Sequence, residues 1–249
     1  MRRAVLLAVP LLALAVPARA DGPSLMAPAH PGGVTRVRAK LRPILGVSDG
    51  GGGALAELAV DHYFQSPWRL TLEIAPLALA MGDGSGSIGH FRIGGAYASE
   101  FVEIGATAGT RLHNLGAAGI SFAAFLRLGA VDGLNLTVTN GYVWKRNRYT
   151  GRATVGLDSM TGVFTVPLSR RFALYTEGAY SSDSWMYASL GLRYRLAGEG
   201  RSGTWFLSGS LGLAWVLDRP PCPYPDTGWC SGSTWAAGPT IGLGIERRF

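Results

Sequence analysis

Residues 240–249 read TIGLGIERRF, an alternation of apolar residues with glycine or charged residues that ends on an aromatic. Successive side chains of a β-strand point to opposite faces. One face of this strand would therefore suit hydrocarbon, and the other would suit water. Arg247 falls on the apolar face beside the end, where a long cationic side chain can reach lipid headgroups. The apolar face comprises Ile241, Leu243, Ile245 and Phe249.

This ending resembles the C-terminal signature strand of Gram-negative outer-membrane β-barrel proteins, which typically ends in Phe. The resemblance implies that Phe249 is an assembly signal for the barrel-assembly machinery, and that lipid and lipopolysaccharide of the outer membrane surround the protein. It extends over the whole mature chain as architecture and identifies no subfamily. Because many soluble proteins also end in a strand, a soluble antiparallel sandwich is the alternative fold.

The first twenty residues predict export. Arg2 and Arg3 precede an apolar run over 4–17, and small residues at 18 and 20 suit signal peptidase. We expect a cleaved signal peptide over 1–20, followed by a flexible periplasmic arm over 21–33. A membrane anchor is the alternative, but the run is shorter than the roughly 20 residues of a spanning helix. Later apolar runs are also too short, so a membrane role requires strands.

Two cysteines, Cys222 and Cys230, lie in a proline-rich segment of this exported chain. Their proximity predicts a disulfide that closes an external loop and stabilises the fold by about 2–3 kcal/mol. A redox or metal pair is the alternative, but the spacing is not C-x-x-C and no histidine is near.

From residue 34 onward, alternating segments and turn-rich breaks succeed one another. Breaks after even-numbered segments are short, and most breaks after odd-numbered segments are longer, as in bacterial barrels. We therefore predict one all-β domain over 34–249, a transmembrane antiparallel up-and-down barrel of about 12 strands with both termini in the periplasm. Ten strands is the alternative, because alternation is weakest over 151–159. The expected strands are 34–47, 54–64, 68–80, 88–98, 101–112, 119–129, 134–144, 156–168, 171–181, 184–196, 203–217 and 234–249.

Aromatic residues on the expected outer face gather near both ends of the strands, as membrane interfaces require. Pro43 and Pro76 fall inside expected strands, where each removes a ladder hydrogen bond, so they predict local bulges or shifted boundaries. The periplasmic girdle would comprise Phe64, Trp68, Tyr97, Phe172, Tyr194, Trp205 and Phe249, and the opposite one Tyr142, Tyr180, Trp215 and Trp235.

The inner face is predicted to be charged. The same parity points eleven Lys or Arg side chains and six Asp or Glu side chains inward, a net charge of +5. This set either fills the lumen as a paired polar core or lines a channel that favours small anionic solutes. The basic ladder comprises Arg36, Arg38, Lys40 and Arg42, and the main acidic counter-charges are Glu57, Asp61, Glu73 and Glu246, the last near the ladder after closure.

An outer-membrane hydrolase that modifies lipid is the alternative function. The only rim pair of base and nucleophile is His113 with Ser121, and no third group to orient the histidine is evident. Asp61 and His62 are consecutive, so they point to opposite faces of a strand.

We therefore expect a non-enzymatic protein of the bacterial outer membrane, without a cofactor or a metal. Its role would be that of a porin-like passive channel, or of a structural or surface-exposed barrel. The formal net charge is +7, or +4 without the signal peptide, and the basic residues are scattered through alternating segments. Nucleic acid is therefore not expected as a partner.

Overall fold

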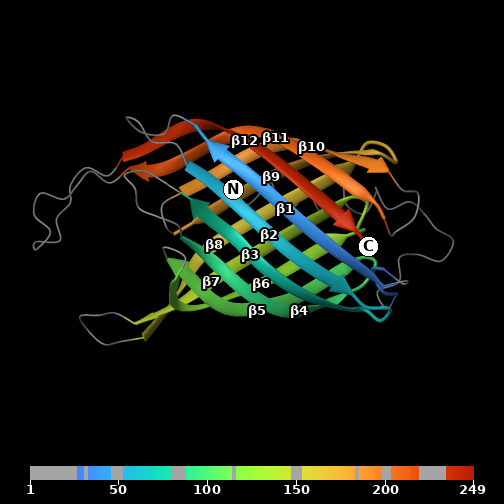
Figure 1. The fold of residues 1–249 in the computed structure, drawn as a ribbon, viewed down its shortest axis with the longest axis horizontal. Coiled ribbons are helices and arrows are strands. Elements are labelled where there is room, and N and C mark those ends of the chain that lie inside the picture. Colours follow the sequence, from blue (N-terminus) through green and yellow to red (C-terminus); the bar gives the residue numbers. More distant parts are fainter. Residues whose placement is uncertain are drawn as a thin grey trace, which may run out of the picture.

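The computed structural model describes residues 27–30, 33–45, 53–79, 88–113, 116–146, 153–182, 185–197, 203–218 and 234–249. These residues form twelve β-strands that close into one antiparallel barrel (Figure 1). Each strand pairs with its neighbours in sequence, and β1 (Val34–Ile44) pairs with β12 (Thr234–Arg248) to complete the ring. The predicted number of twelve is confirmed, and the ten-strand alternative is wrong. No helix among the described residues is long and apolar enough to span a membrane.

The two ends of the barrel are told apart by the connections between strands, of which four at one end are only three to five residues long. We call the end that carries the connections 64–67, 99–101, 130–134 and 168–171 the turn end, and the other the loop end. The intervening strands are β2 (Gly53–Tyr63), β3 (Trp68–Leu79), β4 (Ile88–Ala98), β5 (Val102–His113), β6 (Gly116–Gly129), β7 (Asn135–Arg146), β8 (Ala153–Pro167), β9 (Phe172–Ser181), β10 (Trp185–Ala197) and β11 (Trp205–Asp218).

Three predicted boundaries at the loop end are wrong by three residues each, and the first is the end of β1, which lies at Ile44 and not at residue 47. Strand β6 begins at Gly116, not at residue 119, so only two residues separate it from β5. The side chains at 116–119 are glycine and alanine, which give no alternation to detect. Strand β8 begins at 153, not at 156, and contains a bulge: the register with β7 shifts between Gly141 and Tyr142, opposite Asp158. Because Asp158 and Ser159 are consecutive and both buried, alternation is lost there.

The prolines behave differently from one another. The register of β3 shifts against both neighbours around Pro76, between Ala56 and Leu58 on β2 and between Ile74 and Leu77 on β3 itself. The bulge predicted at Pro76 is confirmed. Pro43 instead lies opposite Ala54 in an unshifted register, so it forms no bulge.

The outer face is mainly apolar, as the alternation predicts. Leu211, Leu243 and Leu190 are 69%, 59% and 54% exposed, whereas charged side chains such as Asp61 and Arg248 are buried inside. This arrangement is the inverse of a soluble sandwich, which buries its apolar faces against each other. The soluble alternative is therefore excluded.

Aromatic pairs mark both ends of the outer face. At the turn end, Trp68 packs edge-on against Tyr97, and the rings of Phe172 and Tyr194 lie 4.7 Å apart. Towards the loop end, Phe122 stacks on Tyr142 at 5.4 Å. Phe249 lies half exposed on this face, and the Arg247 guanidinium sits over its ring at 4.2 Å. The backbone of Phe249 also exchanges two hydrogen bonds with Thr35 on β1.

Candidate functional site

The four cations of the basic ladder lie in the lumen. Arg36, Arg38, Lys40 and Arg42 alternate along β1 with outward residues such as Leu41, which is 47% exposed. Each cation contacts a carboxylate on another strand: the first two reach the adjacent β2, and the last two reach β9, which is distant from β1 both in the sequence and around the ring. The alternation therefore determines that these four side chains point into the lumen, while the carboxylates that they meet depend on how the barrel closes.

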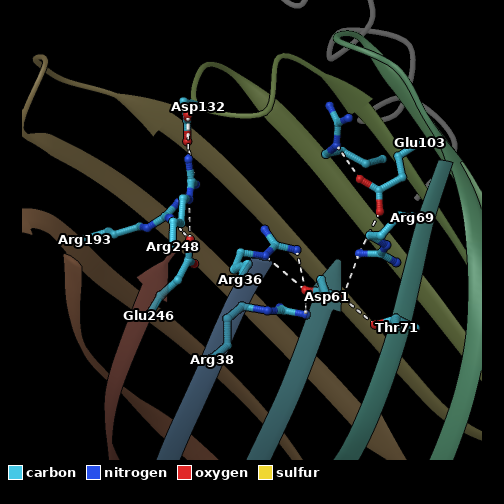
Figure 2. Close-up of polar contacts among 11 residues, drawn as sticks. Arg36, Arg38, Asp61, Arg69, Thr71, Glu103, Asp132, Arg193, Glu246 and Arg248 are labelled. Atoms are coloured by element: carbon cyan, nitrogen blue, oxygen red, sulfur yellow. Dashed lines mark hydrogen bonds and ion pairs between the residues drawn. The ribbon is translucent and has the colours of Figure 1, made fainter. Parts of the chain in front are cut away.

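Asp61 on β2 is the centre of the first cluster (Figure 2). Its fully buried carboxylate accepts from Arg36 at 2.8 Å and lies 3.1 Å from Arg38 and 3.3 Å from Arg69. The hydroxyl of Thr71 donates to the other carboxylate oxygen. One negative charge is thus shared by three arginines, which leaves a local excess of positive charge.

Glu103 on β5 extends this cluster around the wall. It pairs with Arg69 at 2.8 Å and with Arg127 at 3.2 Å. The ring of Tyr63 lies beneath two of the guanidiniums, with the Arg36 centre 5.3 Å and the Arg69 centre 5.8 Å from its centroid. Glu103 is not among the predicted main counter-charges, although its parity is inward.

Glu246 on β12 is the centre of a second cluster (Figure 2). It accepts from Arg193 and from Arg248, both at 2.9 Å. Glu246 lies opposite Arg38 in the register between β1 and β12, so the predicted proximity to the ladder is correct, but its ion-pair partners are other arginines. Arg248 also forms two parallel hydrogen bonds, at 2.8 and 2.9 Å, with Asp132 in the turn between β6 and β7.

Partial burial of the Asp132 carboxyl, whose side chain is 43% exposed, opposes its ionisation, but the hydrogen bonds and the positive charge of Arg248 outweigh that effect. The pKa of Asp132 is consequently held below its ordinary value. Asp132 lies outside the strands, and its inward contact was not predicted because a turn carries no alternation.

Glu177 on β9 is the centre of a third cluster, which sequence reasoning did not single out. It contacts Lys40, accepts from Arg42 at 2.9 Å, and accepts from the Tyr187 hydroxyl at 2.9 Å. The Arg42 guanidinium also lies 4.0 Å from the centre of the Tyr187 ring. Inward parity was the only available signal, and it could not show that Glu177 faces β1 around the ring.

The two remaining predicted counter-charges, Glu73 and Glu57, differ in whether they form an ion pair. Glu73 pairs with Arg92 at 2.8 Å and accepts from Thr107 at 3.1 Å. Glu57 lies opposite Lys40 in the register, but none of the ion pairs found among the described residues includes it.

The inward charge is smaller than predicted. Two further carboxylates, Asp132 and Asp158, point to lumen residues, so the inward side chains among the described residues comprise eleven cations and eight anions, a net charge of +3 instead of +5. The surplus is still positive because single carboxylates serve two or three cations each.

The residues of the basic ladder differ in solvent exposure. The side chain of Arg38 is 42% exposed, whereas that of Arg42 is 2% exposed. Arg38 is therefore the ladder residue that a solute in the lumen would meet first. One portion of the charged lumen is therefore packed, and another is open to solvent.

Of the candidate pair Ser121 and His113, the histidine side chain lies outside the described part of the structure. The Ser121 hydroxyl lies 2.7 Å from Nδ1 of His90, whose Nε2 lies 2.8 Å from Asp158. The β8 bulge directs Asp158 into the lumen, and the Ser182 hydroxyl donates to it at 3.1 Å. His90, Ser121 and Asp158 are all at most 2% exposed.

An apolar cluster inside the lumen near the loop end was also missed. It is formed by Ile44, Leu55, Trp185, Tyr187 and Ala214, all almost fully buried. These residues have inward parity, so the alternation could have revealed them. The assumption of a uniformly polar lumen hid them.

Several predicted features lie outside the described residues. These are the signal peptide, most of the arm over 21–33, and both Cys222 and Cys230. Among the residues that the structure describes, no three His, Cys, Asp or Glu side chains gather to form a metal site.

A closed antiparallel barrel with an apolar outer face, aromatic ends and a charged lumen is the architecture of integral outer-membrane proteins, because closure leaves no unpaired strand edge in lipid. The chain is a 12-stranded β-barrel of this type. No family model matches its sequence, and neither does any curated protein.

Solved structures similar to the chain include outer-membrane channels. The NanC porin is 14% identical with a TM-score of 0.49, and the alignment covers 85% of this chain and 98% of that one. The CymD monoaromatic hydrocarbon channel is 10% identical with a TM-score of 0.44, covering 86% and 88%. OccK2 of Pseudomonas aeruginosa is 14% identical with a TM-score of 0.30, covering 87% and 67%.

Proposed function

We propose that the protein is a non-enzymatic, porin-like channel of the bacterial outer membrane that favours small anionic solutes. The termini would lie in the periplasm, so the turn end would face that compartment. The observation that carries the proposal is the sharing of Asp61 among three arginines, of which Arg38 remains exposed to the lumen.

Anions are favoured because the surplus of positive charge lines a narrow lumen whose walls have a low dielectric constant. Such a wall raises the local concentration of ions of opposite sign. Asp61 and Glu177 each neutralise one cation and leave at least one more, whereas Asp132 supplies a second carboxylate to the two arginines at Glu246. Small anions are therefore the solutes that gain most from entering this lumen.

The test is the ion selectivity of the purified protein in planar bilayers under a KCl gradient. Wild-type protein should give a reversal potential of the sign that marks chloride preference, and Arg38→Glu should weaken or reverse it. Arg170→Glu is the matched control, because it makes the same charge change on an exposed turn outside the lumen. A cation-preferring wild type, or an Arg38→Glu channel with wild-type selectivity, would contradict the proposal.

A hydrolase is the second candidate, favoured by the contacts that join Ser121, His90 and Asp158. Catalysis requires a nucleophile that a substrate carbonyl can reach. The Ser121 side chain has no exposed surface, so the three residues form a polar tie between β4, β6 and β8. Fluorophosphonate labelling of the wild type that disappears in Ser121→Ala would overturn this assignment.

A further inference from the structure

The turn between β6 and β7 crosses the lumen. Asp132 in this turn binds Arg248 on β12, and β6 and β12 are separated by five strands, β1–β5, in the closed ring. The pair therefore joins opposite walls at the turn end, as Figure 2 shows with Asp132 above Arg248. Val131, next in the chain, packs against the buried side chains of Tyr63 and Ala98.

Within the described part of the chain, no other turn at the same end forms an ion pair across the lumen. The turn between β8 and β9 hydrogen-bonds to itself, through Leu168, Ser169 and Phe172, and its residues are exposed. A short β-turn at this end therefore does not need to fold inward. Arg248 would also keep one carboxylate partner without Asp132, because Glu246 accepts from it.

The segment before β1 covers the neighbouring part of the mouth. Pro28 forms an isolated β-bridge with Ser99, supported by hydrogen bonds from Ala29 to Ala98 and from Glu100 to Ala27, both at 3.0 Å. His30 is 2% exposed, and its ring stands edge-on to the inward ring of Tyr63, with 4.5 Å between centroids.

Gly33 makes this return possible. Its φ of 70° lies in the left-handed region, and its amide donates to the carbonyl of His30 at 3.0 Å. The chain can thus reverse from the mouth of the barrel into β1 without strain. Ala29 completes the contact, since it packs with Tyr63 and Ala98 in the cluster that Val131 covers.

We propose that residues 27–30 and the turn 130–134 form a two-part lid over the turn end of the channel, and that the Asp132–Arg248 pair is its latch. In the latched state the turn is tied across the lumen, and release of the latch lets the turn swing clear. The groups around the latch that carry charge or can titrate are Arg193, Arg248, Glu246 and His30. This inference rests on the proposed channel function and specifies how passage would be limited.

Single-channel recording of the mature full-length protein tests the latch. Asp132→Asn removes the charge with little change in shape, and should raise the open probability on the order of tenfold, as expected when a bidentate charge-assisted pair is lost. Arg248→Lys keeps the cation beside Glu246 but not the paired hydrogen bonds, and should give a smaller rise.

Glu100→Gln is the matched control. It removes one negative charge at the same end, from a carboxylate that forms none of the ion pairs found among the described residues, and it keeps the backbone amide that bonds Ala27. This variant should behave as wild type. The heat-dependent gel mobility of each variant establishes that it has folded.

The outcomes separate the lid from the channel. Wild-type open probability in both Asp132→Asn and Arg248→Lys, together with intact anion preference, would overturn the lid and leave the channel. Absence of conductance from wild type and from both latch variants would overturn the channel and the lid with it.

Discussion

The wall formed by β1 and the wall formed by β7 and β8 line one lumen in two different ways. Strand β1 directs four cations inward. The inward residues of β7 and β8 between the Asp158 bulge and the turn end are uncharged, with Thr139 opposite Thr161 in their register, and we call this stretch the neutral wall. A hydroxyl in a polar lumen needs one partner, but a buried ion loses several kcal/mol of hydration and requires matched counter-charges. A barrel interior can therefore be filled without charge, and the basic wall points to a role beyond filling.

Loss of the Glu177 carboxylate, which pairs with the basic wall, should have the largest effect on stability. Glu177→Gln leaves Lys40 and Arg42 without their carboxylate, so the free energy of unfolding should fall by about 3 kcal/mol. The measurement is urea unfolding in lipid vesicles followed by tryptophan fluorescence. A loss below about 1 kcal/mol would show that the basic wall depends little on its counter-charges.

A cation added to the neutral wall should make the two walls alike. Thr161→Lys introduces one charge opposite Thr139, and a unit charge about 8 Å from a passing anion in water is worth about 0.5 kcal/mol. The ratio of chloride to potassium permeability should rise roughly twofold in bilayer recordings. An unchanged ratio would mean that ions do not pass along this wall.

Acid should weaken the charged contacts without any mutation. The pKa of Asp132 is lower in the folded chain than in the unfolded chain, so its contribution to stability is complete above the ordinary value of about 3.9 and is lost as the pH falls below it. The urea concentration at the midpoint of unfolding should therefore decrease as the pH falls below about 4. Asp132→Asn should show a shallower drop, and equal slopes in the two proteins would contradict the assignment.

Removal of a hydroxyl from the neutral wall should have the smallest effect. Thr139→Val deletes one polar group that faces the lumen and should change the free energy of unfolding by less than about 1 kcal/mol, with ion selectivity unchanged. Urea unfolding and reversal potentials measure the two quantities. A shift in selectivity as large as that of Arg38→Glu would show that the threonine wall, too, selects the solute.

The features that the sequence predicted are those that depend on a period of two. Alternation indicated the number of strands, the inward direction of the Arg36 to Arg42 ladder and the outward position of Phe249, because neighbouring side chains of a strand must point to opposite faces. It failed where the period is interrupted. The bulge at Asp158 places two consecutive side chains inside, and the glycine and alanine residues at the start of β6 offer no contrast between the two faces.

The sequence by itself determined the architecture and the chemistry of each face, because both depend on local alternation and composition. Only the tertiary structure decided which polar groups meet: Arg42 with Glu177, Ser121 with His90, and Arg248 with Asp132. These residues lie on strands or turns distant in the sequence, and they come together because long side chains reach across a lumen whose width and register arise from closure of the whole ring. Pairing of charges across the lumen is thus a property of the barrel, which no single strand encodes.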